Sequence, residues 1–181
     1  MQTWIGLFRA INVGGRNKLP MAPLKSLLES LRCKSVRTYI QSGNVVFQSA
    51  SKTEKNLKQR IQDAIEQEFE FRPNLLLLTP EDLRAAIRNN PFPKATAAPK
   101  TLHFYFLDSI PRSADMAAMD SLATEEEEFQ LEGRVFYLHA TAGFARSRLA
   151  ASAERKLGVA ATARNYATVE KIVEMVNEVD S

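Results

Sequence analysis

Two short loops that combine glycine with amide and cationic side chains are the parts of this sequence best suited to chemistry. The first covers residues 9–18 and reads Arg-Ala-Ile-Asn-Val-Gly-Gly-Arg-Asn-Lys, and the second, at residues 41–44, reads Gln-Ser-Gly-Asn. Glycine lets the backbone turn its N–H groups toward an anion, and the cationic side chains add positive charge. We therefore expect these loops to bind an anionic ligand. The candidate ligand-binding residues are Arg9, Asn12, Gly14, Gly15, Arg16, Lys18, Gln41, Ser42 and Asn44.

A second group of candidate residues lies nearer the C-terminus and contains three arginines. Guanidinium groups, with their forked donors, suit phosphate or carboxylate. Ser147 and Asn165 could instead cap helices, which is a purely structural role. The N-terminal loops have a similar structural alternative, because glycine and asparagine are common wherever a tight turn needs a positive φ. The second group comprises Arg146, Ser147, Arg148, Arg164 and Asn165.

The sequence contains no recognisable catalytic constellation or metal site. No Gly-x-x-x-x-Gly-Lys-Ser/Thr occurs, so a phosphate-binding P-loop is excluded. The two histidines and Cys33 lie far apart and lack the spacing of metal ligands. Ser147 and His139 match a nucleophile and its base in residue type, without a third member. We therefore assign no catalytic residue and expect no metal or cofactor.

The composition indicates a cytoplasmic protein with a sizeable core. Hydrophobic residues make up 45% of the 181 residues, and the formal net charge is +3. This mildly basic balance permits an anionic partner, such as a phosphate-bearing small molecule or a nucleic-acid backbone, without demanding one. A single cysteine excludes an intramolecular disulfide and fits a reducing compartment. No apolar stretch is as long as a membrane span and the N-terminus lacks a basic, signal-like start, so we expect no membrane association.

The apolar pattern predicts an α+β fold of tandem ferredoxin-like units packed together. Strand and helix periodicities in the first half follow the order β-α-β-β-α-β, which is the split β-α-β arrangement, and the second half repeats this order. The first unit is expected over residues 1–79. Residues 80–181 are expected to hold an extra linking helix, the second unit and a C-terminal helix. In the first half, the predicted strands are residues 4–11, 35–40, 45–49 and 74–78, and the predicted helices centre on residues 21–31 and 57–69.

The predicted topology brings candidate residues together at sheet edges. The first and second strands of a split β-α-β unit run parallel, so we expect residues 12–18 and 41–44 to meet within hydrogen-bonding reach. By the same argument, residues 140–147 and 164–166 should be neighbours in the second unit. The segment at residues 4–11 is apolar on both faces, which predicts that both faces of the first sheet are covered. This pattern disfavours an RNA reader with an open sheet face.

Four stretches of the chain form a recognisable set of motifs. Residues 7–15, 37–47, 90–93 and 163–166 read Leu-Phe-Arg-Ala-Ile-Asn-Val-Gly-Gly, Arg-Thr-Tyr-Ile-Gln-Ser-Gly-Asn-Val-Val-Phe, Asn-Pro-Phe-Pro and Ala-Arg-Asn-Tyr. Together they resemble an uncharacterised bacterial family, domain of unknown function 1697, and the resemblance implies ferredoxin-like units but no particular activity. That family's first motif usually reads Arg-Gly-Ile-Asn, where this chain has Ala10 in place of the glycine. Residues 143–149 are similar to the family's Gly-x-x-x-Ser-Lys-Leu pattern, with Arg148 in place of lysine.

Three classes of function remain open on these observations. The first is a module that binds an anionic ligand without chemistry of its own. The second is a small enzyme that acts on a phosphorylated or carboxylated metabolite or a nucleotide, with arginines stabilising developing charge. The third is a structural or protein-partner module whose loops hold its two halves together. The oligomeric state, and whether the N-terminal and C-terminal basic loops form one site, depend on packing beyond the sequence pattern.

Overall fold

The computed structural model describes all residues 1–181 as two compact units with α+β architecture. The first unit consists of Met1–Ala85 and Glu170–Ser181, and the second of Ala86–Val169. Each unit contains one four-stranded antiparallel sheet, and the chain has six α-helices. The predicted α+β class is therefore confirmed. None of the helices combines the length and apolar character that crossing a membrane requires.

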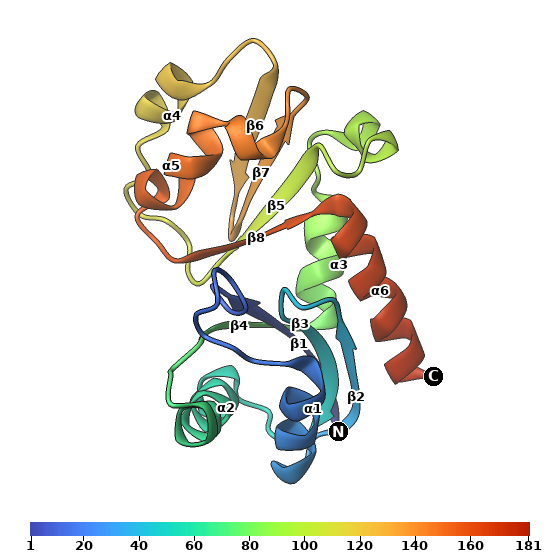
Figure 1. The fold of residues 1–181 in the computed structure, drawn as a ribbon. Helices are drawn as coiled ribbons and strands as arrows, with labels where there is room; N and C mark the ends of the chain where they lie inside the picture. Colours follow the sequence, from blue (N-terminus) through green and yellow to red (C-terminus); the bar gives the residue numbers. More distant parts are fainter. The chain divides into compact units, whose positions relative to one another are not determined.

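The first unit is built on a sheet with the strand order β2-β3-β1-β4, so the N-terminal strand is central (Figure 1). The chain enters β1 directly, crosses through a helix to the edge strand β2, and turns back into β3. Its elements are β1 (Gln2–Arg9), α1 (Met21–Ser30), β2 (Lys34–Tyr39), β3 (Asn44–Ser49), α2 (Glu54–Phe69), β4 (Asn74–Leu78) and α3 (Pro80–Arg88), the last of which crosses into the second unit.

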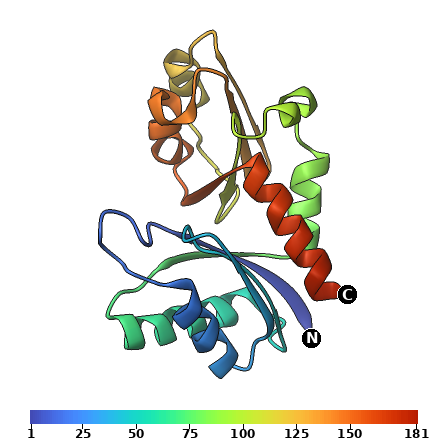
Figure 2. The ribbon, with the colours of Figure 1, turned by 45° about the vertical axis from the view of Figure 1, so that its right-hand side comes forward.

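Strand β1 is buried on both faces of its sheet, as its sequence predicts. Trp4 and Phe8 pack into a core with apolar residues of α1 and α2, which lie on the same sheet face in Figures 1 and 2. Ile5 and Leu7 are fully buried on the opposite face. Because side chains alternate along a strand, burial of consecutive residues requires cover on both sides. No open face is left along this strand for stacking bases.

The last turns of α6 (Tyr166–Asp180) bind to the first sheet on the face away from α1 and α2. Gln48 Nε2 donates to the carbonyl oxygen of Val179 at 3.2 Å, and Thr3 Oγ1 donates to Asp180 at 2.6 Å. Thr3 and Gln48 are paired in register between β1 and β3, so both side chains leave the same face. The C-terminal segment of the chain therefore lies on the second face of the first sheet.

The second unit is built on a sheet with the order β6-β7-β5-β8, in which all neighbours are again antiparallel. Tyr105 and Phe136 pack with apolar residues of α4 and α5, which cover one face of this sheet (Figure 1). The elements are the 3₁₀ turn η1 (Pro93–Ala97), β5 (Leu102–Leu107), α4 (Met116–Leu122), β6 (Glu127–Glu132), β7 (Val135–Ala140), the 3₁₀ turn η2 (Phe144–Arg146), α5 (Arg148–Leu157) and β8 (Ala161–Asn165).

His103 is an ionisable group buried in β5. Its side chain is stacked on Phe144 of η2 with ring centroids 3.8 Å apart, and its Nδ1 atom is buried without a hydrogen-bond partner. Burial disfavours the charged imidazolium and lowers the pKa of His103 to about 4. The histidine is therefore a neutral core residue that supports the loop carrying Phe144.

This buried histidine predicts a specific acid sensitivity. In the unfolded chain His103 takes up a proton near pH 6.5, whereas in the folded protein it does so near pH 4. The free energy of unfolding should therefore be unaffected above about pH 6.5 and fall by about 3 kcal/mol as the pH drops to about 4. His103→Phe, which retains a ring against Phe144, should lose this part of the pH dependence. Urea denaturation followed by circular dichroism measures it as the difference between the two proteins, and equal pH profiles would contradict it.

Candidate functional site

The two N-terminal loops meet at one edge of the first sheet, as predicted from the topology. Asn12 Nδ2 donates to the carbonyl oxygen of Gln41 at 2.8 Å. The backbone N–H of Phe8 donates to the carbonyl oxygen of Gly43, also at 2.8 Å. The first loop follows β1 and the second follows β2. These strands are both antiparallel to β3 and so run in the same direction, which places the two loops at the same edge of the sheet.

The amide side chains of these loops are used inside the protein. Asn12 Nδ2 also donates to the carbonyl oxygen of Leu19, and Asn12 Oδ1 accepts from the N–H of Leu19 at 2.8 Å. Asn44 is completely buried, and its Nδ2 donates to the carbonyl oxygen of Tyr39 and to Ser42 Oγ. These contacts fix the loop backbones, which is the structural role that the sequence left open for Asn12 and Asn44.

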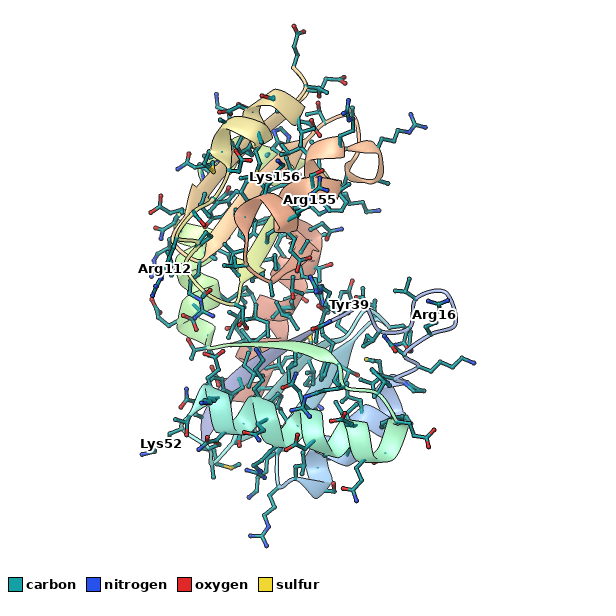
Figure 3. All side chains as sticks on the ribbon, turned by 90° about the vertical axis from the view of Figure 1, so that its left-hand side faces the viewer. Arg16, Tyr39, Lys52, Arg112, Arg155 and Lys156 are labelled. Atoms are coloured by element: carbon teal, nitrogen blue, oxygen red, sulfur yellow. The ribbon has the colours of Figure 1, made fainter.

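The tip of the first loop is an exposed turn that carries two cations. Val13 and Arg16 form an isolated β-bridge around Gly14 and Gly15, which have φ values of +58° and +75°. Positive φ at both central residues is typical of a two-residue hairpin turn. Nothing approaches a Cβ built at either glycine, and Figure 3 shows Arg16 at the outer end of the loop. Arg16 and Lys18 are both exposed there, while Arg9 is half-buried at the end of β1.

In the second unit, Arg146, Ser147 and Arg148 line one hollow with a volume of about 140 Å³. Gly143 and Ala140 form part of its wall. Ser147 is the N-cap of α5 and its Oγ accepts from the N–H of Ala150 at 2.8 Å. Two acidic residues, Glu126 and Glu127, share the hollow with the arginines. The hollow is therefore lined by residues of both charges, two arginines and two glutamates.

Arg164 does not join Arg146 and Arg148, which corrects the expected cluster of three arginines. Ala140 and Tyr166 donate their N–H groups to the carbonyl oxygens of Thr101 and Pro99, respectively, so both segments lie beside the start of β5. Arg164, however, is paired in register with Phe104, whereas η2 packs on the neighbouring His103 through Phe144. Consecutive residues of a strand point to opposite faces, so Arg164 leaves the face opposite to η2.

Arg164 and Asn165 both make hydrogen bonds inside the protein. Arg164 is largely buried, which lowers its pKa to about 10, and its Nη1 donates to the carbonyl oxygen of Ala163 at 2.8 Å. Asn165 Oδ1 accepts from the N–H of Thr168 at 2.9 Å, in the first turn of α6. The capping role considered for Asn165 is therefore confirmed.

A second hollow, not expected from the sequence, lies against the β6–β7 hairpin. It has a volume of about 280 Å³ and is lined by residues 91–95, Glu128 and His139. Glu128 and His139 are paired in register across the hairpin, and His139 Nδ1 lies 3.3 Å from Glu128 Oε2. The sequence held a usable signal, because these two residues are equidistant from the two-residue turn formed by Gly133 and Arg134.

Comparisons with known proteins place the chain in a family and confirm its fold. The family model described as "Protein of unknown function (DUF1697)" matches residues 1–137, so the chain belongs to this family. A solved structure, the conserved bacterial protein SP0830 from Streptococcus pneumoniae, is similar with a TM-score of 0.73 and 24% identity. The match covers 97% of this chain and 98% of that one. No curated protein matches the sequence.

The close approach of the two N-terminal loops predicts a large effect of Gly43→Ala. An added Cβ would lie 2.6 Å from Phe8 Cβ and 2.7 Å from Ile11 Cδ1, at a φ of +81°. We expect the free energy of unfolding to fall by roughly 3 kcal/mol, from overlap together with the unfavourable φ. Gly14→Ala has open space at φ +58° and should cost about 1 kcal/mol. Fluorescence of the buried Trp4, the sole tryptophan, reports unfolding of this unit; equal losses would contradict the close approach.

Ala10, where other family members are expected to carry glycine, should be a site of stabilisation. Its φ is +56°, in the region that costs a residue with a Cβ about 1–2 kcal/mol. Because glycine also loses more chain entropy on folding, Ala10→Gly should raise the free energy of unfolding by about 0.5–1 kcal/mol. Ala64→Gly, within α2, is the matched control and should lower it by about 1 kcal/mol. Urea denaturation followed by Trp4 fluorescence measures both; a loss of stability in Ala10→Gly would contradict the strain.

Proposed function

We propose that this protein binds an anionic ligand, bearing a phosphate or carboxylate group, in the hollow lined by Arg146, Ser147 and Arg148. The observation that carries the proposal is that two arginines, separated by one residue in the sequence, line the same hollow. Guanidinium groups match the geometry of phosphate and carboxylate oxygens, which makes charge-assisted hydrogen bonds to such groups strong. The proposed function is binding, without an assigned catalytic step.

The position of the hollow at the start of α5 supports the proposal. Arg148 is the first residue of this ten-residue helix, and Ser147 caps it. The unsatisfied N–H groups of a helix N-terminus carry partial positive charge, which adds to the attraction of the guanidinium groups. The stacking of Phe144 on the buried ring of His103 fixes the preceding turn. A pre-positioned loop loses less conformational entropy when a ligand binds.

The acidic neighbours set the expected strength of binding. Glu127 Oε2 accepts from the N–H of Thr124 at 3.0 Å and from its hydroxyl at 3.3 Å, which holds this carboxylate within its own turn. Glu126 is exposed. Both negative charges oppose an incoming anion, so binding should be modest and should weaken as salt screens the arginines.

In the N-terminal loops, the side-chain amides favour a structural role over binding of the anionic ligand. Asn12 and Asn44 make hydrogen bonds that join the two loops to each other, to Leu19 and to Tyr39 at the end of β2. Arg16 and Lys18 remain exposed at the loop tip and are the N-terminal alternative for anion binding. We retain them as a second candidate site because no acidic residue occurs within residues 1–28.

The proposal extends to the fold of each unit. The element order β-α-β-β-α-β and the strand orders β2-β3-β1-β4 and β6-β7-β5-β8 are those of a split β-α-β unit, and we propose that both units are ferredoxin-like. In sequence, the repeat divides near residue 79, with α3 as the linking helix. From the composition, we also propose that the protein is cytoplasmic.

Replacing the two arginines tests the proposed anion site. Arg146→Gln and Arg148→Gln should each weaken binding of inorganic phosphate, or of a nucleoside monophosphate, by about tenfold or more, the loss expected for one charge-assisted hydrogen bond. Arg155→Gln, at the other end of α5, is the matched control and should bind as the wild type does. Calorimetric titration at low and high salt measures the affinities.

The outcomes of this titration separate the two candidate sites. Glu126→Gln should strengthen binding, because it removes a negative charge beside the arginines. A loss confined to Arg16→Gln would move the site to the N-terminal loops. No binding of any anion at low salt, or equal binding by the wild type and both arginine variants, would leave the structural role of these loops as the remaining function.

A further inference from the structure

The β6–β7 hairpin carries a different set of side chains on each of its two faces near Ala140. Glu127 is paired with Ala140, and both line the hollow that holds the arginines. The next pair, Glu128 with His139, lines the second hollow of about 280 Å³. Because neighbouring residues of a strand point to opposite faces, the two hollows lie on opposite sides of the sheet. The second hollow is therefore separate from the proposed anion site.

His139 lies beside a carboxylate on the wall of this second hollow. Its Nδ1 atom lies 3.3 Å from Glu128 Oε2, while the His139 side chain is 17% exposed. A carboxylate at Nδ1 favours the ring tautomer in which Nδ1 carries the hydrogen. When Nδ1 carries the hydrogen of a neutral imidazole, Nε2 is the acceptor of the ring, and His139 lines the hollow.

The other wall of the hollow is apolar and fixed by local hydrogen bonds. Pro91, Phe92 and Pro93 supply it, and the Phe92 ring centroid lies 6.2 Å from that of His139. Asn90 Oδ1 accepts from the N–H of Phe92 at 3.0 Å, and the carbonyl oxygen of Phe92 accepts from Ala95. These bonds order the Asn-Pro-Phe-Pro segment around the aromatic ring, so the apolar wall is formed before any ligand arrives.

We propose that this hollow binds a small planar aromatic molecule that donates an N–H or O–H group to His139 Nε2. Phe92 and the flanking prolines contact the faces and edges of the ring, and Glu128 holds His139 in the accepting tautomer. Binding pockets of this kind combine an apolar lining with a few oriented polar groups, and the volume suits one or two fused rings. Lys94, which also lines the hollow, accommodates an acidic substituent.

Indole and 1-methylindole test this proposal, because they have nearly the same shape and differ in the N–H donor. The full-length protein should bind indole about tenfold more tightly, as expected for one hydrogen bond. Titration followed by ¹H–¹⁵N correlation spectra should shift the amide signals of Phe92, Lys94, Ala95, Glu128 and His139. The signals of residues 143–148 should stay in place, which distinguishes this site from the anion site.

Variants of the polar groups separate recognition of the donor from simple apolar contact. His139→Phe retains a ring but loses the acceptor, so it should bind indole and 1-methylindole equally. Glu128→Gln should reduce the preference for indole while leaving His139 in place. Glu132→Gln, on the same strand and the same sheet face, is the matched control and should keep the full preference. Phe92→Ala should weaken both molecules.

Three results would overturn the proposal. Equal affinity of the wild type for the two indoles would show that no hydrogen bond is made. Retention of the preference in His139→Phe would assign the acceptor elsewhere. Signal shifts outside residues 91–95, 128 and 139, or none at concentrations up to about 10 mM, which is a weak-binding limit, would exclude a site in this hollow.

Discussion

Alternation of side chains along the strands is the constraint on which the rest of this structure depends. In both units the central strand is apolar at consecutive positions, so each sheet must be covered on two faces. In the first unit, α1 and α2 cover one face, and the end of α6 is bonded to the other through Gln48 and Thr3. The C-terminal helix is therefore bonded to the sheet that contains the N-terminal strand.

The same alternation sorts the functional candidates of the second unit. His103 and Phe104 are neighbours in β5, yet His103 supports η2 while Phe104 is paired with Arg164. Because Arg164 is paired with Phe104 rather than with His103, it lies on the sheet face opposite to Arg146 and Arg148. On the β6–β7 hairpin, the same alternation places Glu127 in the hollow lined by the arginines and Glu128 in the hollow lined by His139. Two chemically different surfaces arise from one pair of strands.

The N-terminal loops show how a structural site and a ligand site share the same residue types. Glycine and asparagine tolerate the positive φ that a crowded edge requires, and the asparagine amide can bond to backbone groups that the turn leaves unpaired. Asn12 and Asn44 do this inside the protein, and Gly43 lies where a Cβ would overlap Phe8. In such loops the hydrogen-bond partners lie within the protein, whereas in ligand-binding loops they belong to the ligand. Residue type alone does not distinguish the two cases.

The sequence by itself determined the α+β class, the order of the elements and the meeting of residues 12–18 with residues 41–44. These follow from local apolar periodicity and from the parallel course of two strands. Tertiary structure alone decided that the side-chain amides of Asn12 and Asn44 form hydrogen bonds within the protein. It also decided that Arg164 lies on the sheet face opposite to Arg146 and Arg148, and that Glu128 and His139 line a hollow with Phe92. Such outcomes depend on strand register and on contacts between distant segments, and local sequence pattern carries no direct record of either.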